Sequence, residues 1–339
     1  MFIPQELQEA TRVATMLHPP KTSHTPLPTV IPDLPRIHYQ TSSEVGHRTL
    51  WVVCVLMGLS SLAFYIMAMR VPVQKRLFHV ITALVTTFGF LSYYAMATGD
   101  GITSHPYVSE RSKHGAVVEI VNRDIYWARY VDWSLTTPLL LLDLCLLAGI
   151  NGASILVALV SDVIMILTGL FAAFARDEAQ GWGWYAIACI AYLNVVYQVG
   201  YKGRHAISAR DNKTRAFFGA ISLFTLLLWT AYPIVWGIAD GARRVNVDGE
   251  IIAYAILDVL AKGVFGFWLL LTHDNMTRIL PAVDGFWSHG ISHDGAIRVG
   301  LLVLNPLSIT DCQTGRRRAY ARRQLSSSRK EAMKIRVGY

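Results

Sequence analysis

The chain has 339 residues, of which 53% are hydrophobic and 16% are charged, and its mean hydropathy is +0.36. Because soluble domains carry about 25% charged residues, much of this protein's surface is expected to face lipid rather than water. The high apolar content excludes a disordered chain, and the four cysteines form neither a CxxC metal spacing nor a recognisable disulfide framework. The formal net charge of +8 raises the question of a nucleic-acid partner, which the positions of the basic residues decide.

A segment rich in proline, serine and threonine precedes a series of long apolar stretches. This segment, residues 1–46, has no signal-peptide pattern and is predicted to form a flexible arm. Each apolar stretch approaches the roughly 20 residues that a membrane-spanning helix needs, and is too long and too continuously apolar for a barrel strand. The seven stretches cover residues 49–69, 77–98, 125–147, 152–174, 182–201, 216–239 and 251–272.

The predicted fold is therefore all-α. It is a polytopic membrane protein, with a seven-transmembrane-helix bundle over residues 47–275 and a basic, disordered cytoplasmic tail over residues 276–339. Loops rich in Lys and Arg stay in the cytoplasm, and one side of the predicted bundle carries 19 of these residues against 10 on the side of the N-terminus. We therefore expect the N-terminus outside, and attribute the basic charge to topology rather than to nucleic acid.

Strongly ionisable residues lie within the predicted spans. Each would cost about 2.5–3.5 kcal/mol at the centre of an isolated lipid-facing helix, so these side chains should face the bundle interior and find partners there. They either only fix the packing of the helices or form a functional site. The six residues are Arg129, Asp132, Asp143, Asp162, Asp258 and Lys262.

The depth of these residues along their helices favours a functional site. The third and seventh spans both enter from the outside, and Asp132 and Asp258 each lie about 10 Å along them. Lys262 lies one turn deeper than Asp258, so two carboxylates are predicted beside one buried amine. Asp143 follows Asp132 by eleven residues, close to three turns, and shares its face. Together with Arg129 they form an ordered column, an arrangement suited to carrying a proton.

An aromatic stripe lies on the sixth span. Trp229, Tyr232, Pro233 and Trp236 follow helical spacing, and the proline is expected to kink the helix. Such a stripe either packs a core or lines a ligand cavity, and a buried lysine is a residue type that forms Schiff bases with carbonyl compounds. Further walls of such a cavity would come from Trp133, Trp184, Tyr185 and Tyr192.

Three separated motifs resemble those of microbial (type 1) rhodopsins. Residues 129–143, RYVDWSLTTPLLLLD, are similar to the signature of the third helix in that family. The segment LDVLAK at 257–262 resembles the retinal-lysine motif of the seventh helix, and WTAYPIVW at 229–236 resembles its counterpart on the sixth. The resemblance extends from about residue 49 to 273, and it is strongest to fungal opsins of the proton-pumping kind, similar in layout to bacteriorhodopsin.

The resemblance implies a role for each residue of the column. Lys262 would carry all-trans retinal as a protonated Schiff base, Asp132 would be the primary proton acceptor and counterion, and Asp258 the second counterion. Arg129 would be the gate towards the outside, and Asp143 the proton donor. Thr136, Thr137 and Tyr93 match positions that support the counterions and the donor region. The residues that match the retinal pocket are Trp133, Asp162, Met165, Gly169, Trp184, Tyr185, Trp229, Tyr232, Pro233 and Trp236.

The sequence also departs from the family pattern. Tyr185 stands where bacterial pumps often have tryptophan, and Ala188 and Cys189 replace hydroxyl-bearing pocket residues. Glu250 aligns with one member of the family's outer proton-release pair, but Asp240 lies one residue away from the other, so early proton release does not follow from the sequence.

The function that the resemblance implies is a light-driven outward proton pump, a transporter rather than an enzyme, in the plasma membrane. Its partners would be the lipid bilayer, retinal, protons and further copies of itself; no metal or nucleic acid is expected. The alternative is a sensory photoreceptor with the same chromophore; Asp143 argues against it, without excluding it, because sensors can dispense with a donor carboxylate. Lys262 disfavours an opsin relative without retinal, and the apolar donor region disfavours a light-gated channel. The basic tail from Arg316 to Tyr339 is either an anchor at an anionic membrane face or the product of an imperfect gene model.

Overall fold

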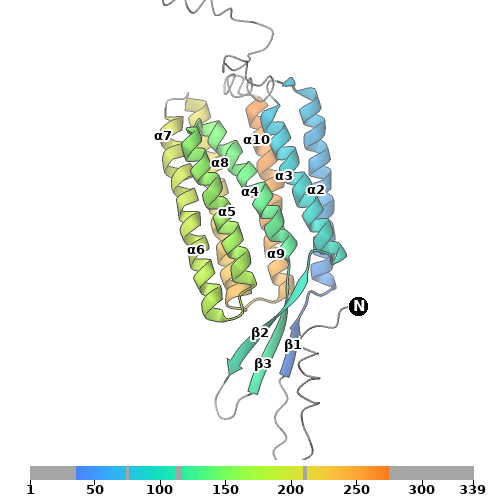
Figure 1. Ribbon diagram of the computed structural model, residues 1–339. Helices are drawn as coiled ribbons and strands as arrows, with labels where there is room; N and C mark the ends of the chain where they lie inside the picture. Colours follow the sequence, from blue (N-terminus) through green and yellow to red (C-terminus); the bar gives the residue numbers. More distant parts are fainter. Residues whose placement is uncertain (1–35, 74–75, 112–116, 209–211, 275–339) are drawn as a thin grey trace, which may run out of the picture.

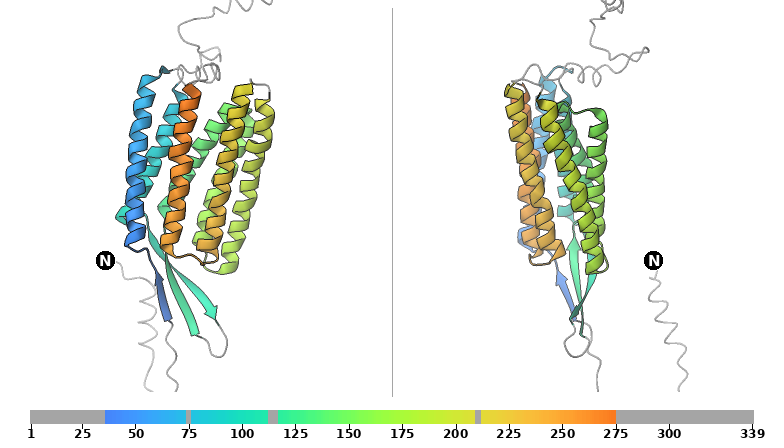
Figure 2. Two further views of the ribbon diagram at one scale, coloured as in Figure 1. Left: turned by 180° about the vertical axis from the view of Figure 1, so that it is seen from behind. Right: turned by 90° about the vertical axis from the view of Figure 1, so that its left-hand side faces the viewer.

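The protein is described here by a computed structural model, which covers residues 36–73, 76–111, 117–208 and 212–274. Within these residues the long helices number seven, counting each helix with its continuations as one. They run side by side and form one bundle (Figures 1 and 2). The all-α bundle predicted from the apolar stretches is therefore confirmed. The helices are α2 (Glu44–Arg70), α3 (Leu77–Thr98), α4 (Trp127–Ala148), α5 (Gly152–Ala173), α6 (Glu178–Val196) continued by η2 (Tyr197–Lys202) and α7 (Gly203–Ile207), α8 (Asn212–Trp236) continued by η3 (Gly237–Gly241), and α9 (Val247–Asp258) continued by η4 (Val259–Val264) and α10 (Phe265–Asp274).

Length and composition fit a bundle that crosses a membrane. Six of the helices within the described residues are long and apolar enough to span a bilayer. The seventh, α6, follows α5 in the chain and runs alongside it (Figure 1). A helix is the expected form for these stretches because it satisfies every backbone polar group within the segment, where lipid offers no hydrogen bonds.

Polar caps and glycines set the ends of several helices. Asn151 accepts a hydrogen bond from the Ser154 N–H (3.0 Å) at the start of α5, and Asn246 does the same for Gly249 N–H (2.9 Å) at the start of α9. Gly149 ends α4 in the left-handed conformation with a φ of 73°, which glycine adopts without steric cost. The boundaries therefore follow from short local signals in the loops.

A small three-stranded sheet projects from one end of the bundle, which we name the sheet end (Figure 1). It comprises β1 (Arg36–Gln40), β2 (Thr103–Arg111) and β3 (Val117–Ile125), with β3 in the centre, antiparallel to β2 and parallel to β1. The prediction of a flexible arm over residues 1–46 is thus wrong for its last part, where residues 36–40 form a strand and α2 has begun by Glu44. The reason is non-local, because β1 pairs with a strand more than 80 residues away. Residues 1–35 and the predicted tail lie outside the described residues.

The buried apolar side chains gather in three groups. One fills the half of the bundle opposite the sheet end, with Phe64, Leu140 and Phe218 among its members. A second packs α2, α3 and α9 together near the sheet end, around Met57. The third is aromatic, includes Trp133, and packs α4, α5, α8 and α9 together. The half of the bundle opposite the sheet end is therefore filled mainly by one apolar group, and the half near the sheet end by two.

Close approach of α10 to α2 and α3 predicts a stability effect at Gly266. A Cβ atom there would lie 2.5 Å from Thr82 Cγ2 and 2.8 Å from Phe64 Cζ. We expect Gly266→Val to destabilise the protein by about 1–3 kcal/mol through overpacking. Gly219→Ala is the matched control, because the described residues leave open space around its Cβ position on α8. Thermal denaturation in detergent measures both variants, and equal midpoints would contradict the prediction.

Candidate functional site

A buried lysine and two carboxylates occupy the middle of the bundle. Lys262 lies on η4, is 1% exposed, and donates a hydrogen bond to Asp132 Oδ2 on α4. Its Nζ also lies 3.2 Å from Oδ1 of Asp258, four residues earlier in the chain. The two carboxylates thus lie beside the amine, as their common depth in the sequence predicts. With one cation and two anions, this buried group needs additional hydrogen-bond donors.

Those donors go to Asp258 rather than to Asp132. The Tyr93 hydroxyl donates to Asp258 Oδ2 (2.8 Å), while the Tyr232 hydroxyl (2.8 Å) and Trp133 Nε1 (3.2 Å) donate to Oδ1. Asp132 Oδ1 has no hydrogen-bond partner among the described residues. Hydrogen bonds to a carboxylate stabilise its charged form, so of the two carboxylates Asp132 is the better acceptor for a proton from the amine.

Towards the sheet end, the column continues through Arg129. This side chain is 2% exposed, its Nη1 donates to Glu250 Oε1 (2.7 Å), and its guanidinium lies 4.3 Å from the centre of the Tyr254 ring. One turn after Asp132, the Thr136 hydroxyl donates to the backbone carbonyl of Asp132 (2.9 Å), not to its carboxylate. The predicted order of Arg129 and Asp132 along the column is present, and Glu250 extends it outward.

Asp143 lies in apolar surroundings on the other side of the lysine. Its side chain is fully buried, and neither carboxyl oxygen has a hydrogen-bond partner among the described residues. Leu140, Leu144 and Cys145 on the same helix belong to the apolar group that fills this half of the bundle. A carboxyl group without partners in such surroundings is held as the neutral acid, since the buried charge would be costly. Asp143 is therefore suited to giving a proton.

A cavity extends from the lysine between α4, α5, α6 and α8. It comprises about 780 Å³ of space not filled by protein atoms, including space open to the outside, and aromatic and aliphatic side chains form most of its wall. Eight of the ten residues predicted for a retinal pocket line it. The wall includes Trp133, Met165, Gly169, Tyr185, Trp229, Tyr232, Pro233 and Trp236 from that set, and adds Tyr130, Thr137, Leu140, Ile166, Ala188, Cys189, Tyr192, Tyr254, Asp258, Ala261 and Lys262.

Two residues predicted for the pocket are not among those that line this cavity. The Asp162 carboxyl is fully buried on α5, with Oδ2 2.6 Å from the Thr137 hydroxyl. That hydroxyl is also 2.7 Å from the Trp133 carbonyl, and because it has a single hydrogen, both contacts are satisfied when Asp162 is protonated. Trp184 packs edge-on against Phe171, with ring centres 5.2 Å apart. Asp162 thus contacts the lining residue Thr137, whereas Trp184 contacts Phe171, which does not line the cavity.

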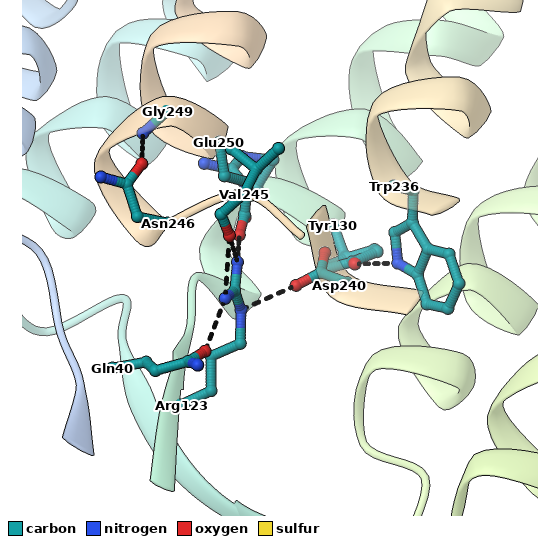
Figure 3. A network of polar contacts seen from close by, with 10 residues as sticks. Gln40, Arg123, Tyr130, Trp236, Asp240, Val245, Asn246, Gly249 and Glu250 are labelled. Atoms are coloured by element: carbon teal, nitrogen blue, oxygen red, sulfur yellow. Dashed lines mark hydrogen bonds and ion pairs between the residues drawn. The ribbon is translucent and has the colours of Figure 1, made fainter. Parts of the chain in front are cut away.

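A second arginine, which the sequence indicates only as a loop charge, joins the column at the sheet end (Figure 3). Arg123 lies on β3 and is 5% exposed. Its Nη2 donates to Glu250 Oε2 (2.7 Å), and its Nε lies 3.6 Å from Asp240 Oδ1. Asp240, placed one residue out of register by motif alignment, therefore lies close to Glu250 after all. No local signal could reveal Arg123, because its position depends on how the sheet pairs.

Comparison with known proteins matches this arrangement to one family. A model of bacteriorhodopsin-like proteins matches residues 46–276. The chain belongs to the bacteriorhodopsin-like family. This family member is 50% identical to Opsin-1 of Neurospora crassa over 304 residues, 85% of this chain and 97% of that one. Its fold matches a light-driven proton pump from Leptosphaeria maculans, with a TM-score of 0.69 and 55% identity over 71% of this chain and 98% of that chain. It also matches halorhodopsin, a light-driven chloride pump, with a TM-score of 0.62 and 29% identity over 70% and 99% of the two chains.

Membership of the bacteriorhodopsin-like family implies an integral, multi-pass membrane protein with a retinal chromophore. The cavity fits such a group on three counts. It is lined by apolar and aromatic side chains, it meets an amine that a carbonyl compound can react with, and Asp132 Oδ1 beside that amine lacks a partner among the described residues. The residues that the structure describes contain no cluster of three His, Cys, Asp or Glu residues arranged to hold a metal ion.

Proposed function

We propose that this protein is a light-driven outward proton pump that holds all-trans retinal covalently on Lys262. One observation carries the proposal: a buried amine has a carboxylate acceptor, Asp132, on one side and a buried carboxyl group, Asp143, about 16 Å along the same helix on the other. The similarity to the Leptosphaeria light-driven proton pump supports it. Retinal supplies the absorption of visible light and a light-driven change of shape in the cavity.

The proton steps belong to side chains of this chain. Lys262 Nζ holds a proton at rest, and Asp132 accepts it, because Asp132 lacks the three donors that stabilise the charge of Asp258. The transfer neutralises an amine and a carboxylate together, which removes the attraction that held them. Asp143 then gives its proton to Lys262 Nζ from the other side. Arg129 lies between Asp132 and Glu250 and lines the way out.

The direction of transport follows from the orientation of the bundle. The acceptor lies towards the sheet end and the donor towards the opposite end, and the Lys and Arg distribution favours a cytoplasmic position for the donor end. Transport is then outward, across the plasma membrane. In this proposal the seven-helix bundle up to residue 275 is the retinal-binding domain, β1 and the start of α2 belong to it rather than to the N-terminal arm, and residues 276–339 are a basic tail.

Protons are favoured over chloride as the transported ion. A chloride pump of this architecture needs room for an anion next to the cationic nitrogen. Here the carboxylate of Asp132 already accepts a hydrogen bond from Lys262 Nζ, and Asp258 lies 3.2 Å from the same atom. A third anion at this buried point would be repelled by both carboxylates.

Light-dependent pH changes test the proposal. Cells that express the full chain, given all-trans retinal and illuminated in weakly buffered medium, should acidify the medium, and a protonophore should abolish the change. Replacing chloride by sulfate should leave the signal intact. If the protein binds retinal and is coloured but leaves the external pH unchanged, the proposal is wrong. If the pH change requires chloride, the protein transports an anion instead.

Asp143→Asn separates the pump from the alternative, a sensory photoreceptor. An amide cannot give up a proton to Lys262, so we expect reprotonation of the Lys262 nitrogen to slow by roughly 10²-fold. Flash photolysis at several pH values measures this step. In the variant the rate should rise with proton concentration, because the proton then comes from solvent. Added azide, a small diffusible acid, should restore the speed. A slow wild-type step that Asp143→Asn leaves unchanged would favour the sensor.

A further inference from the structure

Arg123 contacts both outer carboxylates, and the proposed proton steps give it no role. Its side chain donates to Glu250 Oε2 (2.7 Å) and has its Nε 3.6 Å from Asp240 Oδ1. Gln40 Oε1 on β1 accepts a further hydrogen bond from Arg123 Nη1 (2.8 Å), and the Val245 carbonyl lies 3.4 Å from that nitrogen (Figure 3). The sheet thus holds a guanidinium in a fixed position at the outer end of the column.

Each carboxyl oxygen of Glu250 accepts a hydrogen bond from a different arginine. Its Oε1 accepts from Arg129 Nη1 and its Oε2 from Arg123 Nη2, each at 2.7 Å, and its side chain is 3% exposed. A protonated carboxyl group has to use one oxygen as a donor, but guanidinium groups offer only donors. Both oxygens of Glu250 face such donors, and this arrangement favours the charged carboxylate form of Glu250 over the protonated form.

Positively charged groups outnumber the carboxyl groups around Glu250. Asp240 lines an outer cavity together with Arg123 and Arg243. Three guanidinium groups, counting Arg129, therefore accompany the two buried carboxylates. The guanidinium of Arg243 also lies 3.3 Å from the centre of the Tyr107 ring. The other ionisable groups that line this cavity are His105, Asp177 and Glu178, which belong to β2, the loop before α6 and the first turn of α6.

We infer that Arg123 is a positioning residue that, with Arg129, keeps the outer exit empty of protons in the dark. The inference rests on the proposed pump. The consequence is that proton release is late. Because Glu250 carries no proton when Asp132 becomes protonated, a proton reaches the outside only when Asp132 itself loses one. Uptake at the donor end therefore precedes release at the sheet end.

Removing the Arg123 charge should reverse that order. In Arg123→Gln, Glu250 and Asp240 face each other with Arg129 as the nearest remaining partner of Glu250, and one proton from the outer water would be shared between them in the dark. When Asp132 takes up the Lys262 proton, it no longer offsets the positive charge of Arg129. The electrostatic repulsion between Arg129 and the shared proton therefore increases. That proton then leaves first, and Asp132 later replaces it.

The test uses the full chain in detergent, loaded with all-trans retinal, and a pH-sensitive dye in flash photolysis. In the wild type, dye alkalinisation should precede acidification; in Arg123→Gln, acidification should come first. Infrared difference spectra provide a second readout. A carboxylic-acid band lost on illumination should appear in Arg123→Gln and vanish in Arg123→Gln/Glu250→Gln. Arg123→Lys keeps the charge and should keep the wild-type order, as should Arg176→Gln, which removes an exposed arginine on the same side.

The outcomes separate this inference from the pump itself. Absence of net transport by the wild type would reject the proposed function, whatever the order of the dye signals. Net transport with release before uptake in the wild type would overturn the inference alone, and so would an unchanged order in Arg123→Gln together with no new carboxylic-acid band. If Arg123→Gln does not fold, Gln40→Ala, which removes a hydrogen bond that orients Arg123, should still advance part of the release.

Discussion

Lys262→Ala should abolish all visible absorbance after addition of all-trans retinal. The amine is the group in the cavity wall that can form a covalent bond with a carbonyl compound, and it lies with 1% exposure between the two carboxylates. Without it, Asp132 and Asp258 would face each other as uncompensated buried anions, and at least one of them should take up a proton. Absorption spectra before and after addition of retinal measure the loss.

A matched lysine and a chemical rescue keep this result from being mistaken for misfolding. Lys202→Ala should leave the absorption spectrum unchanged, because Lys202 lies away from the cavity. It donates a hydrogen bond to Ser154 Oγ (3.1 Å) at the end of the bundle opposite the sheet end. A preformed conjugate of retinal with a small primary amine should restore visible absorbance to Lys262→Ala, since the cavity wall remains. Normal colour in Lys262→Ala with free retinal would mean that attachment is elsewhere or that none is needed.

The fold could be predicted from the sequence because a helix that crosses a lipid bilayer requires a long, continuous apolar stretch, which is easily recognised. Seven apolar stretches near the length of a bilayer leave one economical structure, and their order in the chain is the order of the helices. The sheet could not be predicted in the same way. Residues 36–40 are an ordinary polar segment until they pair with β3, and nothing near them in the chain indicates that partner.

The candidate site also has a part that could be predicted from the sequence and a part that could not. Asp132, Asp258 and Lys262 lie on regular helices, where 1.5 Å per residue converts sequence position into depth, so their meeting could be predicted. Arg123 lies on a strand, and its contacts with Glu250 and Asp240 depend on how the sheet meets the bundle. Side-chain direction was also beyond the sequence, which is why Asp162 and Trp184, predicted for the pocket, are not among the residues that line the cavity.

Asp132→Asn should stop proton transport while leaving the protein coloured. The amide keeps the shape of Asp132 but neither accepts a proton from Lys262 nor balances its charge, so transport should fall to background. Loss of the anion beside the cationic nitrogen should also shift absorbance to longer wavelength, because the charge is then less confined to that nitrogen. Absorption spectra and illuminated-cell pH measurements on one preparation report both effects.

The asymmetry between the two carboxylates gives this prediction its sharper form. Asp258 accepts hydrogen bonds from Tyr93, Tyr232 and Trp133, which fix it as an anion, whereas among the described residues only Lys262 donates to the Asp132 carboxylate. Asp132→Glu retains a titratable acceptor and should therefore keep measurable transport, whereas Asp132→Asn should not. If Asp132→Asn pumped as well as Asp132→Glu, the acceptor would have to be Asp258, and three hydrogen bonds would have failed to hold its charge.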